Sequence, residues 1–250
     1  MGASHPFLGH QAGIAAAAVP QGDIRIQSSE GGDLGACFAA PDAGRPAPAV
    51  VLASAIHGVD DDIRAMAAEF AAGGYVAAAP DLFWRTLPGP LPRGDPRAAQ
   101  RAQPRVEKIA AGERDLADVL RALREQPLFN GRAALMGFCY SGPYAILGPK
   151  RLGYHAGIAC HGTRMLDFID ELEAIDRPVR ILWGDRDTMA PASVLEAYGR
   201  LAARERNVDV HVLPGVRHGY MMRGNVPAFD RAAYRFSMDC ALAMLESLRD

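Results

Sequence analysis

The chain has 250 residues, 49% of them hydrophobic and 22% charged, and its formal net charge at pH 7 is -2. This length and composition are typical of one α/β domain with a sizeable core. The nearly balanced charge argues against nucleic acid or an anionic membrane as a partner. No apolar run approaches the roughly 18 residues that a membrane-spanning helix needs.

The first 22 residues are expected to form a flexible extension, followed by a single domain over residues 23–250. The extension has one short apolar run, 14–19, and lacks the basic start and long apolar stretch of a signal peptide. Four cysteines without paired spacing are typical of reduced thiols rather than a disulfide framework; they are Cys37, Cys139, Cys160 and Cys240. We therefore expect a cytoplasmic protein that is a monomer or a small homo-oligomer.

Segments of strand length alternate with segments of helical periodicity along most of the chain. The expected strands cover residues 23–27, 35–39, 49–53, 75–79, 133–136, 155–160, 179–183 and 208–213. The expected helices cover residues 63–72, 106–125, 144–147, 192–205 and 227–248. The first two strands should pair as an antiparallel hairpin, because a Gly-Gly turn separates them. The later alternation predicts a mostly parallel sheet with helices on both faces.

Two connections carry strong turn signals. Residues 81–105 contain five prolines and five arginines, so they cannot form one long regular element. A connection of this length is usually functional, and we expect it to cover the site, with a short helical turn over 96–103. Asn130-Gly131 is predicted to be a turn just before the strand at 133–136.

The segment from Arg132 to Pro143 has the pattern of a nucleophile elbow. A short apolar strand is followed by Gly137, then by Cys139, then by the small Ser141 and an apolar helical segment, which is the strand–turn–helix order of an α/β-hydrolase. A helix N-terminus lowers the pKa of a thiol placed there and favours the thiolate. The alternative is that Cys139 is a small buried side chain that fills space beside the strand.

A carboxylate and a histidine follow the elbow in the order that this fold requires. Asp187 lies in the loop after the 179–183 strand, and His218 lies in the loop after the last strand. Carboxyl ends of parallel strands share one edge, so both should meet Cys139 there. Asp185 is the competing acid, although it directly follows the strand and could serve the turn. Ser141 is a competing nucleophile, but it lies two residues into the helix.

A metal site was also considered, and we do not expect one. His155, Cys160 and His161 are close in sequence, but two of them are adjacent in one loop and no carboxylate has ligand spacing. The sequence contains no signal for another cofactor.

Taken together, these motifs resemble those of the dienelactone hydrolase family of α/β-hydrolases. The similarity runs from Asp23 to the C-terminal helix. The family hydrolyses a cyclic enol ester that carries a carboxylate, in the breakdown of catechol-type aromatics. The motifs are Ile24-Arg-Ile-Gln-Ser28, Ala79-Pro-Asp-Leu-Phe83 with Arg85, Gln126-Pro-Leu-Phe-Asn-Gly131, Gly137-Phe-Cys139-Tyr140, Gly184-x-x-Asp187 with Pro191, and His218-Gly-Tyr220.

The resemblance implies a role for each catalytic position. Cys139 would be the nucleophile, His218 the base and Asp187 the group that orients the base. The backbone amides of Ile56 and Tyr140 would form the oxyanion hole.

The same resemblance implies a set of substrate-binding residues. Arg85 matches a family arginine that grips the substrate carboxylate, and Arg223 matches a second one with its spacing off by one residue. Trp84 is expected to supply an apolar wall together with Phe83. A guanidinium suits a carboxylate, so the expected partner is a small anionic lactone or ester.

The chain departs from the family pattern in the loop after the 49–53 strand and in the elbow. Ala55 stands where the family has a glutamate that helps to create the thiolate, and His57 stands where the family has an aromatic residue. Ser141 replaces a glycine of the elbow. The change at Ala55 leaves three options: His218 alone activates Cys139, another carboxylate substitutes, or the substrate is different. His57-Gly58 also resembles the oxyanion loop of general esterases, so the donor could be Ile56 or a nearby amide.

The sequence thus predicts a cofactor-free hydrolase that cleaves a small, carboxylate-bearing lactone or ester through a thioester intermediate. The alternative enzymes are a general carboxylesterase or a thioesterase, which Ala55 and His57 favour. The alternative outside enzymes is a ligand-binding homologue without turnover. The complete Cys139, Asp187 and His218 set argues against it.

Overall fold

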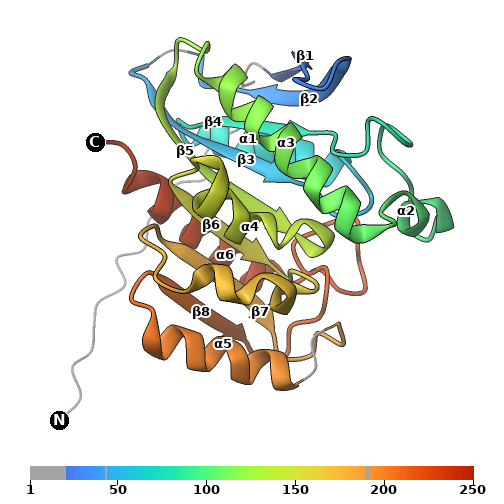
Figure 1. Cartoon of the computed structure of the whole chain (residues 1–250), viewed down its shortest axis with the longest axis vertical. Helices are drawn as coiled ribbons and strands as arrows, with labels where there is room; N and C mark the ends of the chain where they lie inside the picture. The colour runs from blue at the N-terminus through green and yellow to red at the C-terminus, as the bar shows by residue number, and fades with distance from the viewer. Residues whose placement is uncertain (1–20, 43, 190–191) are drawn as a thin grey trace.

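The computed structural model describes residues 21–42, 44–189 and 192–250 and shows one eight-stranded sheet between two layers of helices (Figure 1). The strand order is β1-β2-β4-β3-β5-β6-β7-β8. The strands are β1 (Gln21–Gln27), β2 (Asp33–Ala39), β3 (Ala47–Ala53), β4 (Val76–Pro80), β5 (Phe129–Phe138), β6 (Ala156–Cys160), β7 (Val179–Gly184) and β8 (Val208–Leu213).

The topology confirms the predicted α/β-hydrolase architecture. β1 pairs with β2 and β2 with β4 in antiparallel fashion, and every later pair, from β4–β3 to β7–β8, is parallel. The central strands β3 and β4 are buried along their whole length, because helices cover both faces of a parallel sheet.

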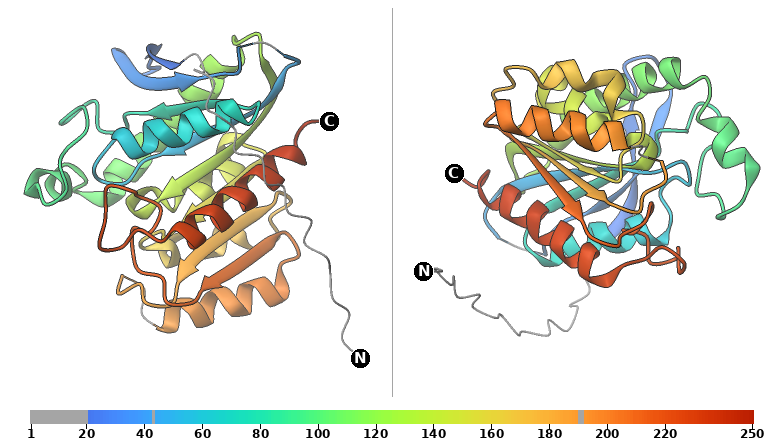
Figure 2. Two further views of the ribbon diagram at one scale, coloured as in Figure 1. Left: turned by 180° about the vertical axis from the view of Figure 1, so that it is seen from behind. Right: turned by 90° about the horizontal axis from the view of Figure 1, so that it is seen from below.

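The helices divide between the two faces of the sheet, as Figure 2 shows from behind and from below. α1 (Asp61–Ala72) and α6 (Arg231–Glu246) cover one face. α3 (Arg105–Leu123), α4 (Tyr144–Leu147) and α5 (Ala192–Arg204) cover the other. The short α2 (Pro96–Arg101) projects at the side within the long connection. No helix of the described residues is long and apolar enough to cross a membrane.

Local backbone chemistry moves two of the predicted boundaries. Asn130-Gly131 is not a turn but part of β5, where Gly131 has a φ of 90° and the pairing with β3 shifts register. α6 begins at Arg231 rather than at Pro227, since the Asp230 side chain accepts a hydrogen bond from the Ala233 amide at 2.9 Å and caps the helix there.

Further differences lie at the N-terminus and after the parallel strands. β1 begins at Gln21, so two residues of the expected extension belong to the sheet, and residues 1–20 lie outside the described residues. A π-helical turn at Gly148–Leu152 extends α4, and a 3-10 helix, Met165–Leu172, follows β6. Hydrophobic periodicity in the sequence did not predict either of these two elements.

The turn after β5 is packed too closely to admit larger side chains. A Cβ atom on Gly137 would lie 2.1 Å from the backbone oxygen of Ser141, and one on Gly142 would lie 2.4 Å from the Cα atom of Gly162. Both obstacles are backbone atoms, which cannot rotate away. The glycines therefore fix how sharply the chain turns from β5 into the following helix.

This packing predicts that Gly137→Ala lowers the free energy of unfolding by about 3 kcal/mol or more, because the added methyl overlaps a backbone carbonyl. The matched control is Gly199→Ala in α5, where a Cβ meets nothing within 4 Å and helix propensity should raise stability by up to about 1 kcal/mol. Urea denaturation measures both. Equal stability of the two variants would contradict the description of the turn.

Candidate active site

Cys139 stands at the tip of the turn after β5 in a backbone conformation that few side chains adopt. Its φ is 50°, in the left-handed region that is strained for a residue with a Cβ. Its carbonyl accepts hydrogen bonds from the amides of Thr163 at 2.8 Å and Gly142 at 3.0 Å, and these hold the strained turn. Cys139 is partly exposed, so the turn delivers the thiol to the surface at the carboxyl edge of the sheet.

The structure joins the predicted histidine to the predicted acid. Nδ1 of His218 lies 2.8 Å from Oδ2 of Asp187. Asp187 is only 4% exposed, and its other oxygen accepts the Met189 amide at 2.8 Å. Asp185 instead accepts the Gly215 amide at 2.6 Å and serves the turn. The choice of Asp187 over Asp185 thus agrees with the geometry.

The electrostatics around His218 favour the charged imidazolium. Burial lowers the pKa of His218, but hydrogen bonds with Asp187 and Cys139 and the negative charges of both residues outweigh it and raise the pKa to about 10. At neutral pH the ring is therefore protonated, with the carboxylate on one side and the sulfur on the other. A cation in this position stabilises a thiolate at Cys139.

Ser141 is not placed to act as a nucleophile. Its side chain is fully buried, and its Oγ donates a hydrogen bond of 2.6 Å to the carbonyl of Ser54. The hydroxyl thus ties the elbow to the end of β3, where a glycine could make no such bond.

Two backbone amides without a hydrogen-bond acceptor among the described residues are candidates for the oxyanion hole. Tyr140 is the second residue of the 3-10 turn Cys139–Ser141, where amides have no intrahelical acceptor. The Ile56 amide has no acceptor among the hydrogen bonds of the described residues. The loop that carries Ile56 is held by Arg101, whose Nε and Nη2 donate to the Ile56 carbonyl at 3.0 and 2.8 Å.

Arg101 belongs to the connection 81–105 and was not singled out by the sequence analysis. It is 5% exposed, and its Nη1 also binds the carbonyls of Leu87 and Gly89, each at 2.7 Å. Its guanidinium lies 4.3 Å from the ring centroid of Phe83. One side chain thus fastens the long connection onto the loop of the expected oxyanion donor.

Arg105, the first residue of α3, makes a second tie at the elbow. Its Nη2 donates to the carbonyls of Tyr140 and Thr163, both at 2.9 Å, and its guanidinium lies 4.5 Å from the Tyr140 ring. Burial lowers the pKa of Arg105, and electrostatic interactions with Tyr140 and then with Cys139 oppose that effect. Arg105 therefore places a positive charge within electrostatic reach of the sulfur.

His161 and His57 bring two more imidazoles to this edge. The His161 ring is fully buried, packs edge-to-face on His218 with centroids 4.9 Å apart, and has no hydrogen-bond partner at either nitrogen among the described residues. Burial and the charge of His218 keep its pKa well below the usual range, so it is neutral. Burial and then the charge of Arg93 lower the pKa of His57, so the predicted His57 lies beside an arginine from the long connection.

Arg85 and Trp84 are engaged by carboxylates of the protein. Arg85 donates to Asp115 at 2.7 Å and to Glu30 at 2.9 Å, so carboxylates of the protein already engage its guanidinium. The Trp84 indole donates to Asp115 at 3.2 Å, and its ring lies against Gly32. These side chains tie the β1–β2 hairpin to α3, and the buried Asp115 explains why both are drawn there.

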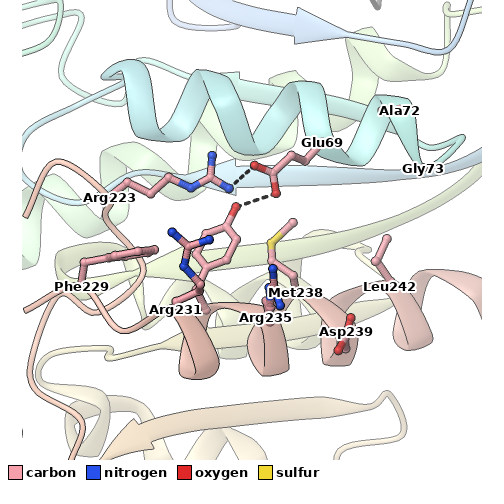
Figure 3. A pocket seen from close by; sticks show the side chains of 11 residues that line it. Glu69, Ala72, Gly73, Arg223, Phe229, Arg231, Arg235, Met238, Asp239 and Leu242 are labelled. Carbon is pink, nitrogen blue, oxygen red and sulfur yellow. Dashed lines mark hydrogen bonds and ion pairs between the residues drawn. The ribbon is translucent and has the colours of Figure 1, made fainter. Parts of the chain in front are cut away.

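Arg223 is likewise engaged by a carboxylate of the protein. Its guanidinium pairs with Glu69 of α1 and lies 4.7 Å from the ring of Tyr234 in α6 (Figure 3). Arg223 thus lines a groove between α1 and α6.

The three residues considered for a metal do not converge. His155 accepts the Ala133 amide at 3.3 Å, Cys160 is fully buried in the core, and His161 packs on His218. Within residues 21–42, 44–189 and 192–250, no three side chains of the metal-binding types gather.

Comparison with known proteins identifies the family. The sequence model of the dienelactone hydrolase family matches residues 34–246. The chain belongs to the dienelactone hydrolase family. It is therefore an ester- or lactone-cleaving hydrolase, as the sequence predicted. Pro191, one residue of the motifs behind that prediction, lies outside the described residues.

Relatives and solved structures agree with this assignment. The chain is 30% identical over 233 residues to carboxymethylenebutenolidase 1 of Cupriavidus pinatubonensis, covering 91% of this chain and 97% of that protein. It is 31% identical over 172 residues to carboxymethylenebutenolidase of Pseudomonas putida, covering 68% and 72%. Its fold matches the dienelactone hydrolase-like promiscuous phosphotriesterase P91 from metagenomic libraries with a TM-score of 0.77, at 19% identity, covering 94% of this chain and all of that one.

The pair of Asp187 and His218 predicts how one substitution changes a titration. Asp187→Asn removes the carboxylate that supports the imidazolium, so the pKa of His218 should fall from about 10 by about one to three pH units. The sign follows because a raised histidine pKa reports stabilisation of the protonated ring, which is lost as pH rises through it. NMR titration of the histidine ring protons, assigned with His218→Gln, measures this.

Asp185→Asn is the matched control, because it removes a carboxylate from the same loop and should leave the titration of His218 unchanged. A fall in the pKa with Asp185→Asn and none with Asp187→Asn would reverse the assignment of the acid.

Arg105 donates hydrogen bonds to two carbonyls at the elbow, and we therefore predict that it positions Cys139. Arg105→Met should slow alkylation of Cys139 by iodoacetamide at pH 7 and lower kcat by about 10- to 100-fold, because one charged hydrogen-bonding group is lost. Arg105→Lys keeps the charge and should recover more of the alkylation rate than of kcat. Arg97→Met is the control, since the one ion pair of Arg97 among the described residues is with the neighbouring Asp95. Unchanged alkylation in both Arg105 variants would refute this role.

Proposed function

We propose that this hydrolase cleaves its substrate through a Cys139 thiolate, with His218 as the proton carrier and Asp187 as the residue that orients it. The observation that carries the proposal is the 2.8 Å contact between His218 Nδ1 and Asp187 Oδ2. Cys139 also acts on this ring, because its interaction with His218 helps to raise the pKa of the imidazole. A nucleophile, a base and an orienting acid in this relation are the parts of an acyl-transfer site.

In the first step, the Cys139 sulfur attacks the carbonyl carbon of the ester or lactone. The negative charge moves to the carbonyl oxygen, where the amides of Tyr140 and Ile56 donate hydrogen bonds to it. When the tetrahedral intermediate collapses, the C–O bond breaks and the imidazolium of His218 gives its proton to the leaving oxygen. The products of this step are a Cys139 thioester and a neutral imidazole.

The second step uses the change of charge that acylation causes. A thioester at Cys139 carries no negative charge, so one support for the protonated ring of His218 disappears and its pKa falls. The neutral imidazole can then take a proton from water as the water oxygen attacks the thioester carbonyl. Collapse of this second intermediate breaks the C–S bond, which releases the acid and leaves the Cys139 thiolate beside the protonated His218.

The absence of the family glutamate at Ala55 fits activation by His218 without a second carboxylate. Ala55 is 9% exposed, and no hydrogen bond in the described part of the chain links a carboxylate to Cys139. The positive charges of His218 and Arg105 instead support the thiolate. Of the three options that the sequence left open, the first is the one that the geometry supports.

We infer that the substrate is a small lactone or ester that carries a carboxylate. Two relatives are named carboxymethylenebutenolidases, and Arg93 and Arg105 contribute positive charge to His57 and Cys139 respectively. The arginines expected for this role, Arg85 and Arg223, are occupied by carboxylates of the protein. The cytoplasmic location, and a state no larger than a small homo-oligomer, stay predictions.

A general carboxylesterase or thioesterase is the second candidate. Ala55 favours it, because the family's route to the thiolate is missing, and so does the engagement of Arg85 by Asp115 and Glu30. A ligand-binding homologue without turnover would need Cys139 to be unreactive.

The proposal predicts that Cys139→Ala lowers kcat/KM for dienelactone by about 10⁴-fold or more, because the thioester route is lost. Ser141→Ala is the matched control two residues away. It removes the 2.6 Å hydrogen bond to the Ser54 carbonyl and should leave the catalytic mechanism unchanged. Steady-state hydrolysis measured at constant ionic strength tests both. Full activity of Cys139→Ala would end the proposal.

A substrate panel separates the candidates that share this mechanism. Dienelactone, its methyl ester and 4-nitrophenyl acetate differ in charge and size. If the substrate carries a carboxylate, kcat/KM should be highest for the free acid. This preference over the neutral esters should become smaller as salt screens the arginines. Equal or better turnover of the neutral esters would favour the general esterase. No turnover together with no alkylation of Cys139 would indicate a binding protein.

A further inference from the structure

A groove of about 820 Å³ lies between the second half of α1 and the first half of α6 (Figure 3). It lies on the face of the sheet that α1 and α6 cover. Cys139, Asp187 and His218 are not among its lining residues. Its volume is within the range of small-molecule sites, which is about 300–1,000 Å³. The proposed hydrolysis uses none of this surface.

The charges at the groove are not balanced by its own carboxylates. Arg223 pairs with Glu69, whose other oxygen accepts the Tyr234 hydroxyl at 2.8 Å, so this cation is compensated. Arg231 and Arg235 lie one turn apart on α6, are exposed, and form no ion pair among the described residues. Like charges at this spacing destabilise a helix slightly. A bound anion would therefore stabilise the two guanidiniums.

The two carboxylates near these arginines in sequence form no ion pair with them in the described part of the chain. Asp230 directly precedes Arg231 and caps α6 by accepting the Ala233 amide at 2.9 Å. Asp239, which also lines the groove, follows Arg235 by four residues, yet it makes no ion pair within the described part of the chain. Among the residues that line the groove, three arginines stand against two carboxylates, which leaves one net positive charge. The view in Figure 3 shows both arginines on the α6 side of the groove.

The floor of the groove is apolar and contains aromatic rings. Phe229 and Tyr234 have ring centroids 5.9 Å apart, and Met238 and Leu242 continue the floor along α6. Such a surface suits the flat body of a ring, which offers a large apolar contact area at a low entropic cost. An anion with a purely polar body would leave this floor in contact with water.

We propose that this groove is a second binding site, for a small carboxylate with an aromatic or alicyclic body. The ring would lie on Phe229, Met238 and Leu242, and the carboxylate would be held by Arg231 and Arg235, whose forked donors match its two oxygens. The site is independent of the proposed chemistry at Cys139.

The test uses the full chain with Cys139 capped by iodoacetamide, so that the catalytic site is blocked and turnover has no part in the readout. Benzoate is titrated into the capped protein, and the methyl resonances of Met238 and Leu242 are followed by NMR. We expect saturable shifts for one site. Benzamide, the neutral isostere, should bind about tenfold or more weakly, because it gives the arginines no charge.

The double variant Arg231→Gln/Arg235→Gln should weaken benzoate binding by about tenfold or more. The matched control is Arg200→Gln/Arg204→Gln, which removes two arginines one turn apart on α5, where carboxylates pair with both. This control should leave the affinity unchanged.

Several results would overturn the proposal. Unsaturable shifts, equal binding of benzamide, or an unchanged affinity in the α6 double variant would each exclude a carboxylate site. Methyl shifts that depend on protein concentration without benzoate would make the groove an interface between two copies of the chain. Because the capped protein cannot turn over, none of these results bears on the catalytic role of Cys139.

Discussion

The structure depends on one close approach, the turn in which β5 enters the elbow. Gly137 admits no side chain because the Ser141 carbonyl lies where its Cβ would be, and Cys139 is forced to a φ of 50°. That strain is offset by hydrogen bonds from the amides of Gly142 and Thr163 to the Cys139 carbonyl. The sulfur is therefore presented by a backbone that cannot relax without disrupting the loop after β6.

The electrostatics of the site follow from what this backbone brings together. A buried carboxylate at Asp187 and a sulfur at Cys139 flank His218, so the imidazole is charged even though it is largely shielded from water. Its neighbour His161 stays neutral because burial and the charge of His218 oppose a second proton. Arg105 donates hydrogen bonds to the carbonyls of Tyr140 and Thr163 at the elbow. The pairing of His218 with Asp187 suits the proton transfers of the proposed cycle.

Much of this arrangement could be read from the sequence, because it depends on order and on local chemistry. The elbow pattern around Cys139, the strand-end positions of Asp187 and His218, and the alternation of strands with helices all follow from short-range rules. The helix start at Arg231 was missed because the Asp230 cap outweighs the helix signal of Pro227.

Other features could not be read from the sequence, because they depend on partners that are distant along the chain. Arg85 is drawn to Asp115 and Arg223 to Glu69, and no local pattern shows which carboxylate an arginine will meet. Arg101 and Arg105 were visible only as members of an arginine-rich connection. Their carbonyl partners, on the Ile56 loop and on the elbow, become neighbours only when the fold has formed.

The most direct test of the central claim is to trap the acyl-enzyme. The protein is mixed with a slowly hydrolysed lactone and quenched in acid during turnover, and its peptides are analysed by mass spectrometry. The account predicts one acyl adduct, on the peptide of Cys139 at the sulfur, and its release by neutral hydroxylamine as expected for a thioester. An adduct on Ser141, or steady turnover with no adduct on Cys139 at any quench time, would contradict it.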